Sequence, residues 1–360
     1  MNIYTDTISK DSIRVRSIFS SARVLVLVGV IASLLINSSE VFAQSANANN
    51  KAGTTSGQFL KIGVGSRYLG MGEAAVAAKG DAFSIFWNPA ALTEIEGSEL
   101  AFAHTNWALD VSLSSVAYAW RWEGLGAVAF GLTALNVPEL EITTVESNES
   151  QQGTGRYYDA PAYAIQAAFA RELTPRFAFG AGVKYVYESI HTETASTIAF
   201  DFGTMLYTGL RSLRMGMSIS NLGGDLRFAG PSLAAQVDDS TFRDGDDASL
   251  DVNSADLPLT FRFGMAYDLD FSLDSRLTLA TEMKHPSDQV RQSSFGLEYG
   301  WKNQFFLRSG YKFNYSEEGL TFGAGLKAPF GTSSRLLIDY AWSDLGRLQS
   351  AHRFSLNLAF

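Results

Sequence analysis

Residues 176–188 read RFAFGAGVKYVYE, and this stretch alternates between two kinds of side chain. The odd-numbered positions from Phe177 to Tyr187 carry aromatic or aliphatic side chains, whereas the even-numbered positions include Gly180 and Lys184. An alternation with period two indicates a β-strand that has one apolar and one polar face. The run is longer than a typical strand of about 5–6 residues. It matches the ~9–11 residues of a tilted membrane strand.

The same alternation recurs along the chain from Ser98 onward, for example over 258–270 and 334–343. A soluble sandwich also alternates, but here the runs are long, and aromatic residues such as Trp120 and Trp301 gather near strand ends, as in membrane-interface girdles. Counting the runs predicts an all-β, 14-stranded antiparallel transmembrane barrel of the outer membrane, an even number as in bacterial single-chain barrels. The predicted strands are 98–105, 111–122, 126–135, 158–171, 176–188, 195–207, 212–221, 256–269, 276–285, 291–301, 304–314, 319–329, 334–343 and 351–360.

The connections between the predicted strands sort by length. They are short after even-numbered strands, as at 302–303, and longer after odd-numbered strands, with 136–157 and 222–255 the longest. In outer-membrane barrels short turns face the periplasm and long loops face outside. We therefore expect both termini in the periplasm. The last strand ends on the aromatic Phe360, which we interpret as the outer-membrane assembly signal.

Residues 1–43 have the features of a secretory signal peptide. A basic stretch that includes Arg14 and Arg23 precedes an apolar run over 24–36, and Val41-Phe42-Ala43 supplies a small-x-small cleavage site. Residues 44–57 are polar and predict a flexible leader. After residue 36 no apolar run reaches the ~20 residues of a membrane helix. Together these features predict export to the bacterial outer membrane.

Composition excludes several classes of function. The chain contains no cysteine, so disulfide scaffolds, thiol catalysis and cysteine-ligated metal sites are excluded. Its net charge of −9 disfavours nucleic acid as a partner, because phosphate binding requires a basic surface. The mean hydropathy of +0.02 is too polar for a bundle of membrane helices.

Residues 58–97 do not alternate and are rich in glycine and alanine. Because this segment precedes the first strand, we expect it to enter from the periplasm and to fold into the lumen as a plug, as in several other barrels. The alternative is a cap on the periplasmic side.

A spaced motif lies within this segment. It reads Ser66-Arg67-x-x-Gly70-Met71-Gly72-x-Ala74, then Asp81, then Trp87-Asn88-Pro89-Ala90-x-Leu92, followed by His104-x-x-Trp107-x-x-Asp110. This pattern resembles the amino-terminal signature of the PorV/PorQ family, within the superfamily of FadL-type fatty-acid transporters. The resemblance implies a 14-stranded barrel whose amino-terminal segment lies in or under the lumen. For PorV-like members it implies a role in type IX secretion, receiving exported proteins and passing them to surface-attachment machinery. The motif residues carried over to the plug are Ser66, Arg67, Gly70, Met71, Gly72, Asp81, Asn88, Pro89 and Ala90.

Searches for catalytic and cofactor motifs give no positive result. The run Gly63-x-Gly65 lacks the third glycine and the strand–helix context of a dinucleotide site. There is no Gly-x-Ser-x-Gly elbow, and His352 and Ser355 differ in strand parity, so they face opposite sides. Paired carboxylates for glycoside hydrolysis are not excluded by spacing, but nothing favours them. We therefore expect no enzyme, no cofactor and no metal.

The two long loops are acidic, and the lumen face carries both signs of charge. A run at 244–247 is rich in aspartate but does not fit EF-hand spacing, so a solvated surface loop is favoured over a calcium site. Lumen-facing charges are expected to pair across strands, with a selectivity ring as the alternative. They are Lys184, Glu188, Asp201, Arg214, Arg262, Asp268, Glu282, Lys284, Arg308, Lys312, Lys327 and Asp339.

Two functions follow from these observations. The first is a non-enzymatic secretion component that docks exported proteins at its outer loops, with outer-membrane lipid, the outer-membrane assembly machinery, secreted cargo and type IX secretion components as partners. The second is a FadL-type passive channel for hydrophobic small molecules such as long-chain fatty acids. For that channel Phe83, Phe86 and Trp87 are the candidate pocket, although the packing of the plug can use the same residues.

Overall fold

The computed structural model of the chain describes residues 51–143, 154–235, 248–331 and 333–360. The described residues belong to the compact unit Asn50–Phe360. The predicted signal peptide (1–43) and the first part of the predicted leader lie outside the described residues.

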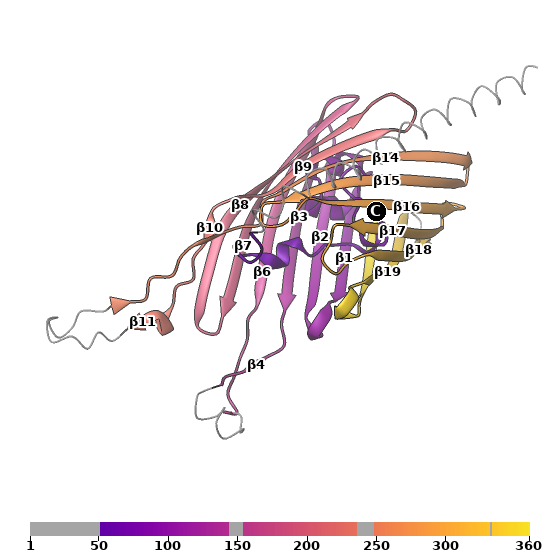
Figure 1. Cartoon of the computed structure of the whole chain (residues 1–360). Coiled ribbons are helices and arrows are strands. Elements are labelled where there is room, and N and C mark those ends of the chain that lie inside the picture. The colour runs from indigo at the N-terminus through magenta and orange to yellow at the C-terminus, as the bar shows by residue number, and fades with distance from the viewer. Residues whose placement is uncertain (1–50, 144–153, 236–247, 332) are drawn as a thin grey trace, which may run out of the picture. The chain divides into compact units, whose positions relative to one another are not determined.

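In the described part of the chain, fourteen strands form one closed antiparallel barrel, as the sequence predicts (Figure 1). Neighbours in sequence are neighbours in the sheet, and the ring closes where β1 pairs with β20, from Glu99 opposite Ala359 to Asn106 opposite His352. The strands are β1 (Ser98–Asn106), β2 (Ser112–Trp122), β3 (Gly126–Asn136), β6 (Ala162–Thr174), β7 (Phe177–Ile190), β8 (Glu193–Tyr207), β9 (Arg214–Gly223), β14 (Thr260–Ser272), β15 (Ser275–Pro286), β16 (Gln292–Trp301), β17 (Phe305–Phe313), β18 (Leu320–Phe330), β19 (Ser334–Asp344) and β20 (Ser350–Ala359).

Each strand presents an apolar face outward and a small or polar face to the lumen. In β1, Leu100 and Phe102 are 44% and 43% exposed, whereas the alternate residues Ala101 and Ala103 are buried. A closed barrel leaves no sheet edge with unpaired backbone groups, so it can span a bilayer with such an apolar outer surface. The period-two pattern and the fold therefore place this protein in the bacterial outer membrane.

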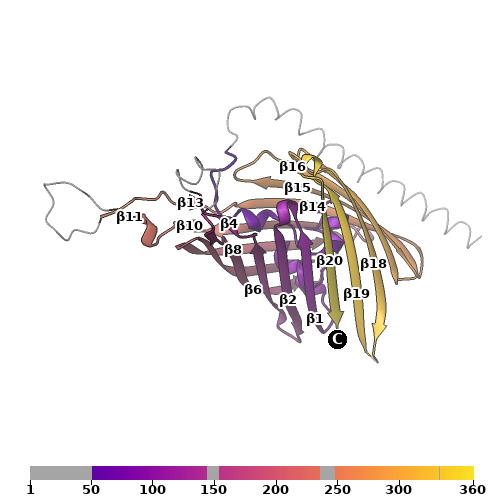
Figure 2. The ribbon, with the colours of Figure 1, turned by 90° about the horizontal axis from the view of Figure 1, so that it is seen from below.

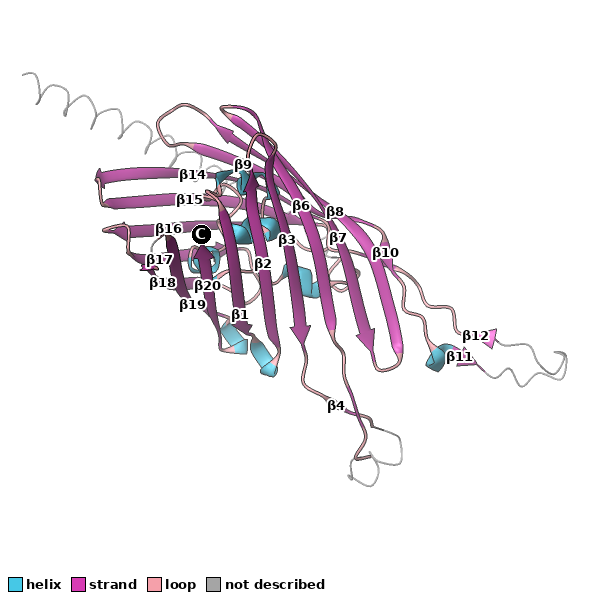
Figure 3. Cartoon of the chain, turned by 180° about the vertical axis from the view of Figure 1, so that it is seen from behind, coloured by secondary structure: helices cyan, strands magenta, loops and turns pink. Residues whose placement is uncertain are grey.

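The two ends of the barrel differ, as the loop lengths predict, except that the β7–β8 connection at the long-loop end consists of only two residues, 191–192. One end carries short turns, such as the β16–β17 turn, in which Lys302 and Asn303 both have positive φ and the Gln304 N–H donates to the Trp301 carbonyl over 3.1 Å, as in a type I′ turn. The other end carries long loops that project beyond the barrel wall (Figures 1 and 3). These loops contain the 3-10 turns η5 (Ala108–Asp110), η6 (Pro231–Leu233) and η7 (Gly346–Leu348) and three two-stranded sheets, β4 (Leu140–Glu141) with β5 (Tyr157–Tyr158), β10 (Asp225–Leu226) with β13 (Ala255–Asp256), and β11 (Ala234–Ala235) with β12 (Ala248–Ser249).

The segment 58–97 lies inside the ring of strands and is called the plug below (Figures 2 and 3). Its ordered turns contact most strands of the wall: α2 touches β17 to β20, η3 touches β1 to β3, and η4 touches β3 and β6 to β8. Most of its residues from 63 to 95 are buried. Its elements are η2 (Gln58–Lys61), α2 (Ser66–Gly70), η3 (Ala82–Phe86) and η4 (Pro89–Glu94).

The path of the chain into the lumen differs from the sequence-based expectation. Residues 51–62 lie at the long-loop end, where the Ser56 N–H donates to the Asp256 carbonyl over 2.9 Å and Lys61 Nζ donates to Asp288 Oδ2 over 2.8 Å. The chain then crosses the whole lumen and leaves at the short-turn end, where the Ser98 N–H meets the Phe360 carbonyl at 2.9 Å. Phe360 therefore lies at the short-turn end as expected, whereas the first described residues, 51–62, lie at the long-loop end. The position of this segment before β1 in the sequence could not reveal its route. The hydrogen bonds that hold it are made to Asp256 and Asp288, which lie in distant loops.

Candidate functional site

The inner wall of the barrel has two chemically different halves. From β1 to β8 its residues are mostly alanine and glycine, for example Ala117, Ala129 and Ala170, which are fully buried. From β9 to β20 the wall carries buried charges that pair across strands, as the sequence predicts for most of its lumen-facing charges. The pairs include Arg214–Asp268 at 2.7 Å, Arg262–Glu282 at 2.8 Å and Arg308–Asp339 at 2.6 Å, and β7 and β8 add Lys184–Asp201 at 3.0 Å.

Glycines around the waist of the barrel allow the plug backbone to touch the wall. A methyl group on Gly216 would lie 2.2 Å from the Val76 carbonyl oxygen, and one on Gly310 would lie 2.2 Å from the Gly72 nitrogen. These separations are well below a van der Waals contact, so a side chain has no space there. Comparable close approaches occur at Gly180, Gly203, Gly264 and Gly296. Plug and wall are therefore in direct contact at this level, on strands from β7 to β17.

Of the four lumen-facing glycines Gly180 and Gly182 on β7 and Gly323 and Gly325 on β18, two contact the plug. Gly180 faces Pro89 and Ala90, and Gly323 faces Gly70. Gly182 instead lies against the neighbouring strand, and Gly325 lies against Asp339 and Arg308.

Arg67 is the polar centre of the plug near the short-turn end. Its Nε and Nη2 donate to the two oxygens of Glu298 over 3.0 and 3.2 Å, and its Nη1 donates to the Lys79 carbonyl over 3.0 Å. A guanidinium suits this position because its planar fork can bind a carboxylate at two points. The preceding residue, Ser66, donates its N–H to Ser355 Oγ on β20 over 3.2 Å. The Ser-Arg pair of the motif thus ties the plug to two distant strands.

The Gly70-Met71-Gly72 part of the motif forms the closest contact with the charged half of the wall. Thr321 Oγ1 donates to the Gly70 carbonyl over 3.2 Å, and Met71 is fully buried. Gly72 has a positive φ of 67° and approaches the backbone of β16 and β17. Only glycine meets both requirements without strain.

Asp81 and Asn88 are the N-caps of η3 and η4, two of the three 3-10 turns of the plug. Asp81 Oδ1 accepts the Phe83 N–H over 2.9 Å, and its other oxygen lies 3.8 Å from Arg67 Nη1. Burial raises the pKa of Asp81 to about 7 although Arg67 opposes the shift, and the Glu99 carboxylate adds to it. The carboxyl group of Asp81 therefore changes its protonation state near neutral pH.

Asn88 joins three parts of the molecule. Its Oδ1 accepts the Ala90 N–H over 3.1 Å, and its Nδ2 donates to the Val76 carbonyl over 2.7 Å and to the Thr204 carbonyl on β8 over 3.0 Å. Pro89 occupies the first turn of η4, where its missing N–H costs nothing. Ala90 is fully buried against the glycine-containing wall of β7.

Two carboxylates that were not recognised as anchors from the sequence fix the middle of the plug. Glu282 on β15 accepts the Ala75 and Val76 N–H groups over 2.9 and 2.8 Å with one oxygen and the Arg262 guanidinium with the other. Glu73 in the plug accepts from Lys312 Nζ over 2.6 Å. Strand parity did place Glu282 in the lumen, but the sequence contains no signal that pairs it with backbone groups of the plug.

Burial alone would raise the pKa of Glu73. Lys312, Lys284 and Arg262 together outweigh burial and lower that pKa to about 2. Glu73 is therefore charged at neutral pH and holds the plug against the basic part of the wall.

The three aromatic residues of the candidate ligand pocket lie within the plug packing. Trp87 donates from Nε1 to the Val64 carbonyl over 2.8 Å, and the Arg262 guanidinium lies 4.9 Å from its ring centre. Phe83 is buried next to Gly65, and Phe86 lies against Gly131 on β3. The cavity that Phe86 and Trp87 border holds about 40 Å³.

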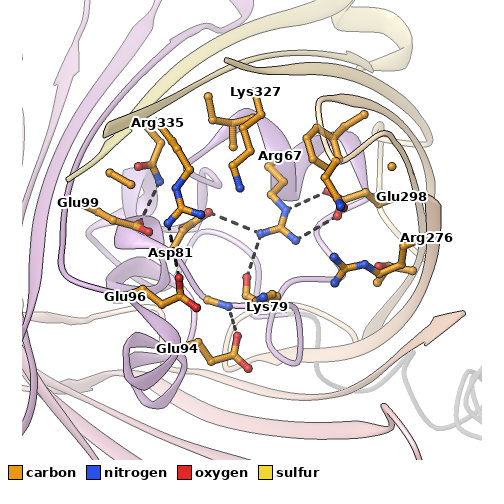
Figure 4. Close-up of a pocket in the computed structure, with 18 of the residues that line it drawn as sticks. Arg67, Lys79, Asp81, Glu94, Glu96, Glu99, Arg276, Glu298, Lys327 and Arg335 are labelled. Atoms are coloured by element: carbon orange, nitrogen blue, oxygen red, sulfur yellow. Dashed lines mark hydrogen bonds and ion pairs between the residues drawn. The ribbon is translucent and has the colours of Figure 1, made fainter. Parts of the chain in front are cut away.

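Larger cavities lie at the two ends of the lumen. The cavity at the short-turn end holds about 420 Å³, and charged residues of both signs dominate its lining (Figure 4). Figure 4 shows Arg67 at its centre and Lys327 pointing into it from the wall. The cavity at the long-loop end holds about 250 Å³ and is lined by Trp107, Lys284, Tyr315 and other residues of the upper wall and loops.

Comparison with known proteins identifies the family. The model of the family described as "Type IX secretion system protein PorV" matches residues 45–287 of this chain. The chain belongs to this family. A comparison with curated proteins finds no match. Among the residues that the structure describes, no helix is long and apolar enough to cross a membrane.

Solved structures with a similar fold include outer-membrane channels. The PorV-family barrel is similar to the CymD monoaromatic hydrocarbon channel (TM-score 0.55, 13% identity, 83% of this chain and 98% of that chain). It is also similar to the Pseudomonas putida toluene transporter TodX (TM-score 0.56, 12% identity, 83% and 99%) and to a Pseudomonas aeruginosa FadL homologue (TM-score 0.51, 11% identity, 83% and 98%). At these identities the likeness shows the barrel fold alone.

The histidines and the acidic loops add no catalytic arrangement in the described residues of this PorV-family barrel. His352 Nδ1 lies 2.8 Å from the Tyr340 hydroxyl, and His104 Nδ1 lies 2.9 Å from Ser114 Oγ. No group of three potential ligands that could hold a metal ion occurs among the described residues. The aspartate-rich run at 244–247, for which a calcium site was the alternative, lies outside the described residues.

Proposed function

We propose that this PorV-family barrel is a non-enzymatic, non-conducting component of type IX secretion that holds exported proteins at its long-loop end. The observation that supports the proposal is the contact between plug and wall at the waist, where the plug backbone touches Gly216 and Gly310, and from it we infer a closed lumen. A barrel closed in this way does not pass cargo through its lumen. Its exposed loops are then the surfaces that bind exported proteins. Loops that project from a rigid barrel are a suitable platform for a protein partner.

The remaining partners follow from the family and the fold. Type IX secretion components and exported proteins are the partners at the loops, and outer-membrane lipid surrounds the apolar wall. The outer-membrane assembly machinery would recognise the last strand, where Phe360 pairs with Ser98 and leaves its ring half exposed.

The experiment removes the projecting loops without disturbing the barrel. Deletion of 142–156 and of 227–254 retains the small sheets at the base of each loop. We expect proteins that depend on type IX secretion to be lost from the cell surface and to accumulate in the periplasm. The matched control carries an inserted epitope between Lys302 and Asn303, at the short-turn end, and should secrete normally. Normal secretion by both loop-deletion variants would contradict the proposal.

The second candidate is a passive channel for hydrophobic small molecules. It is favoured by the fold shared with a monoaromatic hydrocarbon channel and a toluene transporter, and by the aromatic cluster of Phe83, Phe86 and Trp87 in the plug. Uptake of radiolabelled toluene and oleate by cells that express Phe83→Ala or Trp87→Ala tests it, with the lipid-facing Trp122→Ala as the control. Uptake that is the same in all three variants and in cells without the barrel would exclude this function.

A further inference from the structure

Lys284 is a buried cation that lacks a carboxylate of its own. It is 5% exposed, its nearest carboxylate is Glu73 at 3.7 Å, and it donates no hydrogen bond to any described residue. Lys312, on β17, instead contacts two carboxylates, Glu73 at 2.6 Å and Glu318. A buried ammonium without a hydrogen-bonded partner is costly. The site is therefore incomplete as it stands.

The register of the sheet increases this cost. Arg262, Lys284 and Gln292 lie directly opposite one another on β14, β15 and β16, so two cations are cross-strand neighbours. Like charges in that position repel. Glu282 pairs with Arg262 over 2.8 Å, whereas Lys284 reaches only Glu73, at 3.7 Å, and shares that carboxylate with Lys312. Lys284 is thus the most weakly paired cation of this group.

A cavity adjoins Lys284. It holds about 250 Å³ at the long-loop end, and its lining includes Lys284, Gln292, Trp107 and Tyr315. The lining also includes Glu317 and Glu318, whose carboxylates pair with Arg347 and Lys312. Gln292 is buried, and its Oε1 accepts no hydrogen bond from a described residue. Of the two lysines in its lining, Lys61 donates to Asp288, whereas Lys284 donates no hydrogen bond to a described residue. The cavity therefore presents one cation without a hydrogen-bonded anion and one acceptor without a donor. Leu345 and Leu348 supply an apolar side to the same cavity.

These requirements identify the chemistry of the occupant. A carboxylate would accept a hydrogen bond from Lys284 Nζ, and an N–H group would donate one to Gln292 Oε1. A fatty acid offers the carboxylate but no donor, whereas a polypeptide segment offers both. The volume is smaller than the ~300–1,000 Å³ of a site for a drug-sized ligand, so it suits a short piece of chain rather than a folded domain.

We propose that this cavity is a socket for a short, carboxylate-bearing segment of an exported polypeptide, with Lys284 as its anionic anchor. The proposal rests on the proposed function and names the chemistry by which the long-loop end recognises its partner. The carboxylate comes from an acidic side chain or from the end of a polypeptide. Both sources present the same group to Lys284.

The experiment uses the purified full-length barrel in detergent and three small probes, acetyl-Leu-Glu-amide, acetyl-Leu-Gln-amide and acetyl-Leu-Gln with a free carboxylate. Binding is measured by saturation-transfer NMR. We expect both carboxylate-bearing probes, or one of them, to bind at least ten-fold more tightly than the uncharged amide. A preference between the two assigns the source of the carboxylate. Equal binding of all three probes would overturn the proposal.

Substitution at the anchor provides the second measurement. Lys284→Met should abolish the preference for carboxylate, and Lys302→Met, an exposed lysine at the opposite end, should keep it. A purely structural role for Lys284 would lower the stability of the variant. We expect Lys284→Met to retain its heat-modifiable electrophoretic mobility and an unchanged or higher unfolding temperature, because the substitution removes a repulsion. Unaltered carboxylate preference in Lys284→Met would refute the anchor.

The two proposals can fail separately. If the loop deletions block secretion but the probes show no carboxylate preference, the docking function stands and the socket is refuted. If the carboxylate preference depends on Lys284 but the loop deletions secrete normally, the site exists and the docking function fails.

Discussion

Replacing Glu282 by alanine should loosen the middle of the plug while the barrel stays closed. One Glu282 oxygen accepts both the Ala75 and Val76 N–H groups, at 2.9 and 2.8 Å, and the residue is almost fully buried. A hydrogen bond to a charged group contributes about 1.5–3 kcal/mol. The two bonds at the lower limit give about 3 kcal/mol of local stability, which corresponds to a factor of ~10² in the opening equilibrium.

Hydrogen–deuterium exchange measures that factor directly. We expect the amides of Ala75 and Val76 to exchange about 100-fold faster in Glu282→Ala, while amides of the barrel strands keep their protection. Glu317→Ala is the matched control, because its ion pair with Arg347 lies on the exposed rim, where such pairs contribute little. An increase below about three-fold in Glu282→Ala would refute the view that this carboxylate anchors the plug.

Three further predictions concern the plug. Gly216→Ala should lower the unfolding temperature, because its methyl group would lie 2.2 Å from the Val76 carbonyl oxygen. The control Gly319→Ala, where the methyl group has no contact closer than 3.9 Å, should not lower it. Equal unfolding temperatures of the two variants would exclude a closed waist. Because the pKa of Asp81 is raised to about 7, the folded protein binds more protons than the unfolded chain between about pH 4 and 7, so stability should fall as pH rises through this window. Denaturant midpoints should show that decline in the native protein and a smaller decline in Asp81→Asn, whereas parallel curves would contradict the assignment. Arg67→Lys should raise ion conductance in planar bilayers, since an ammonium cannot replace the bonds of the guanidinium at two oxygens; conductance equal to the native level would show that Arg67 does not help to close the lumen.

The barrel could be predicted from the sequence because lipid and lumen impose the same period on every strand. Runs such as 176–188 show two faces, and the even strand count and the sorted loop lengths support one another without reference to tertiary contacts. Parity also identified the lumen-facing charges. It could not assign partners, because register is needed to bring Arg308 to Asp339 or Lys184 to Asp201.

The structure of the plug could not be predicted in the same way, because the hydrophobic residues of its sequence have no periodicity. Its fold depends on contacts between backbone and wall, such as Gly72 against β16 and β17, which leave no pattern beyond the glycines themselves. Glu73 looks like an ordinary solvated residue in a run of small side chains, and only the wall reveals its role as an anchor. The resemblance of the motif located the segment, whereas its route through the lumen required the contacts at Asp256 and Asp288.

The route of the plug constrains how this protein can be made. The chain passes from the long-loop end of the barrel to the short-turn end before β1 begins. The closed sheet therefore surrounds the plug, which precedes it in the sequence. Glycine-lined contacts at the waist leave no space for a chain to be drawn through afterwards. The pairing of β1 with β20 must therefore form last, around a plug that already lies against the incomplete sheet. Insertion into the membrane and folding of the segment are then a single event, and a defect in either would appear as failed biogenesis rather than as a leaky pore.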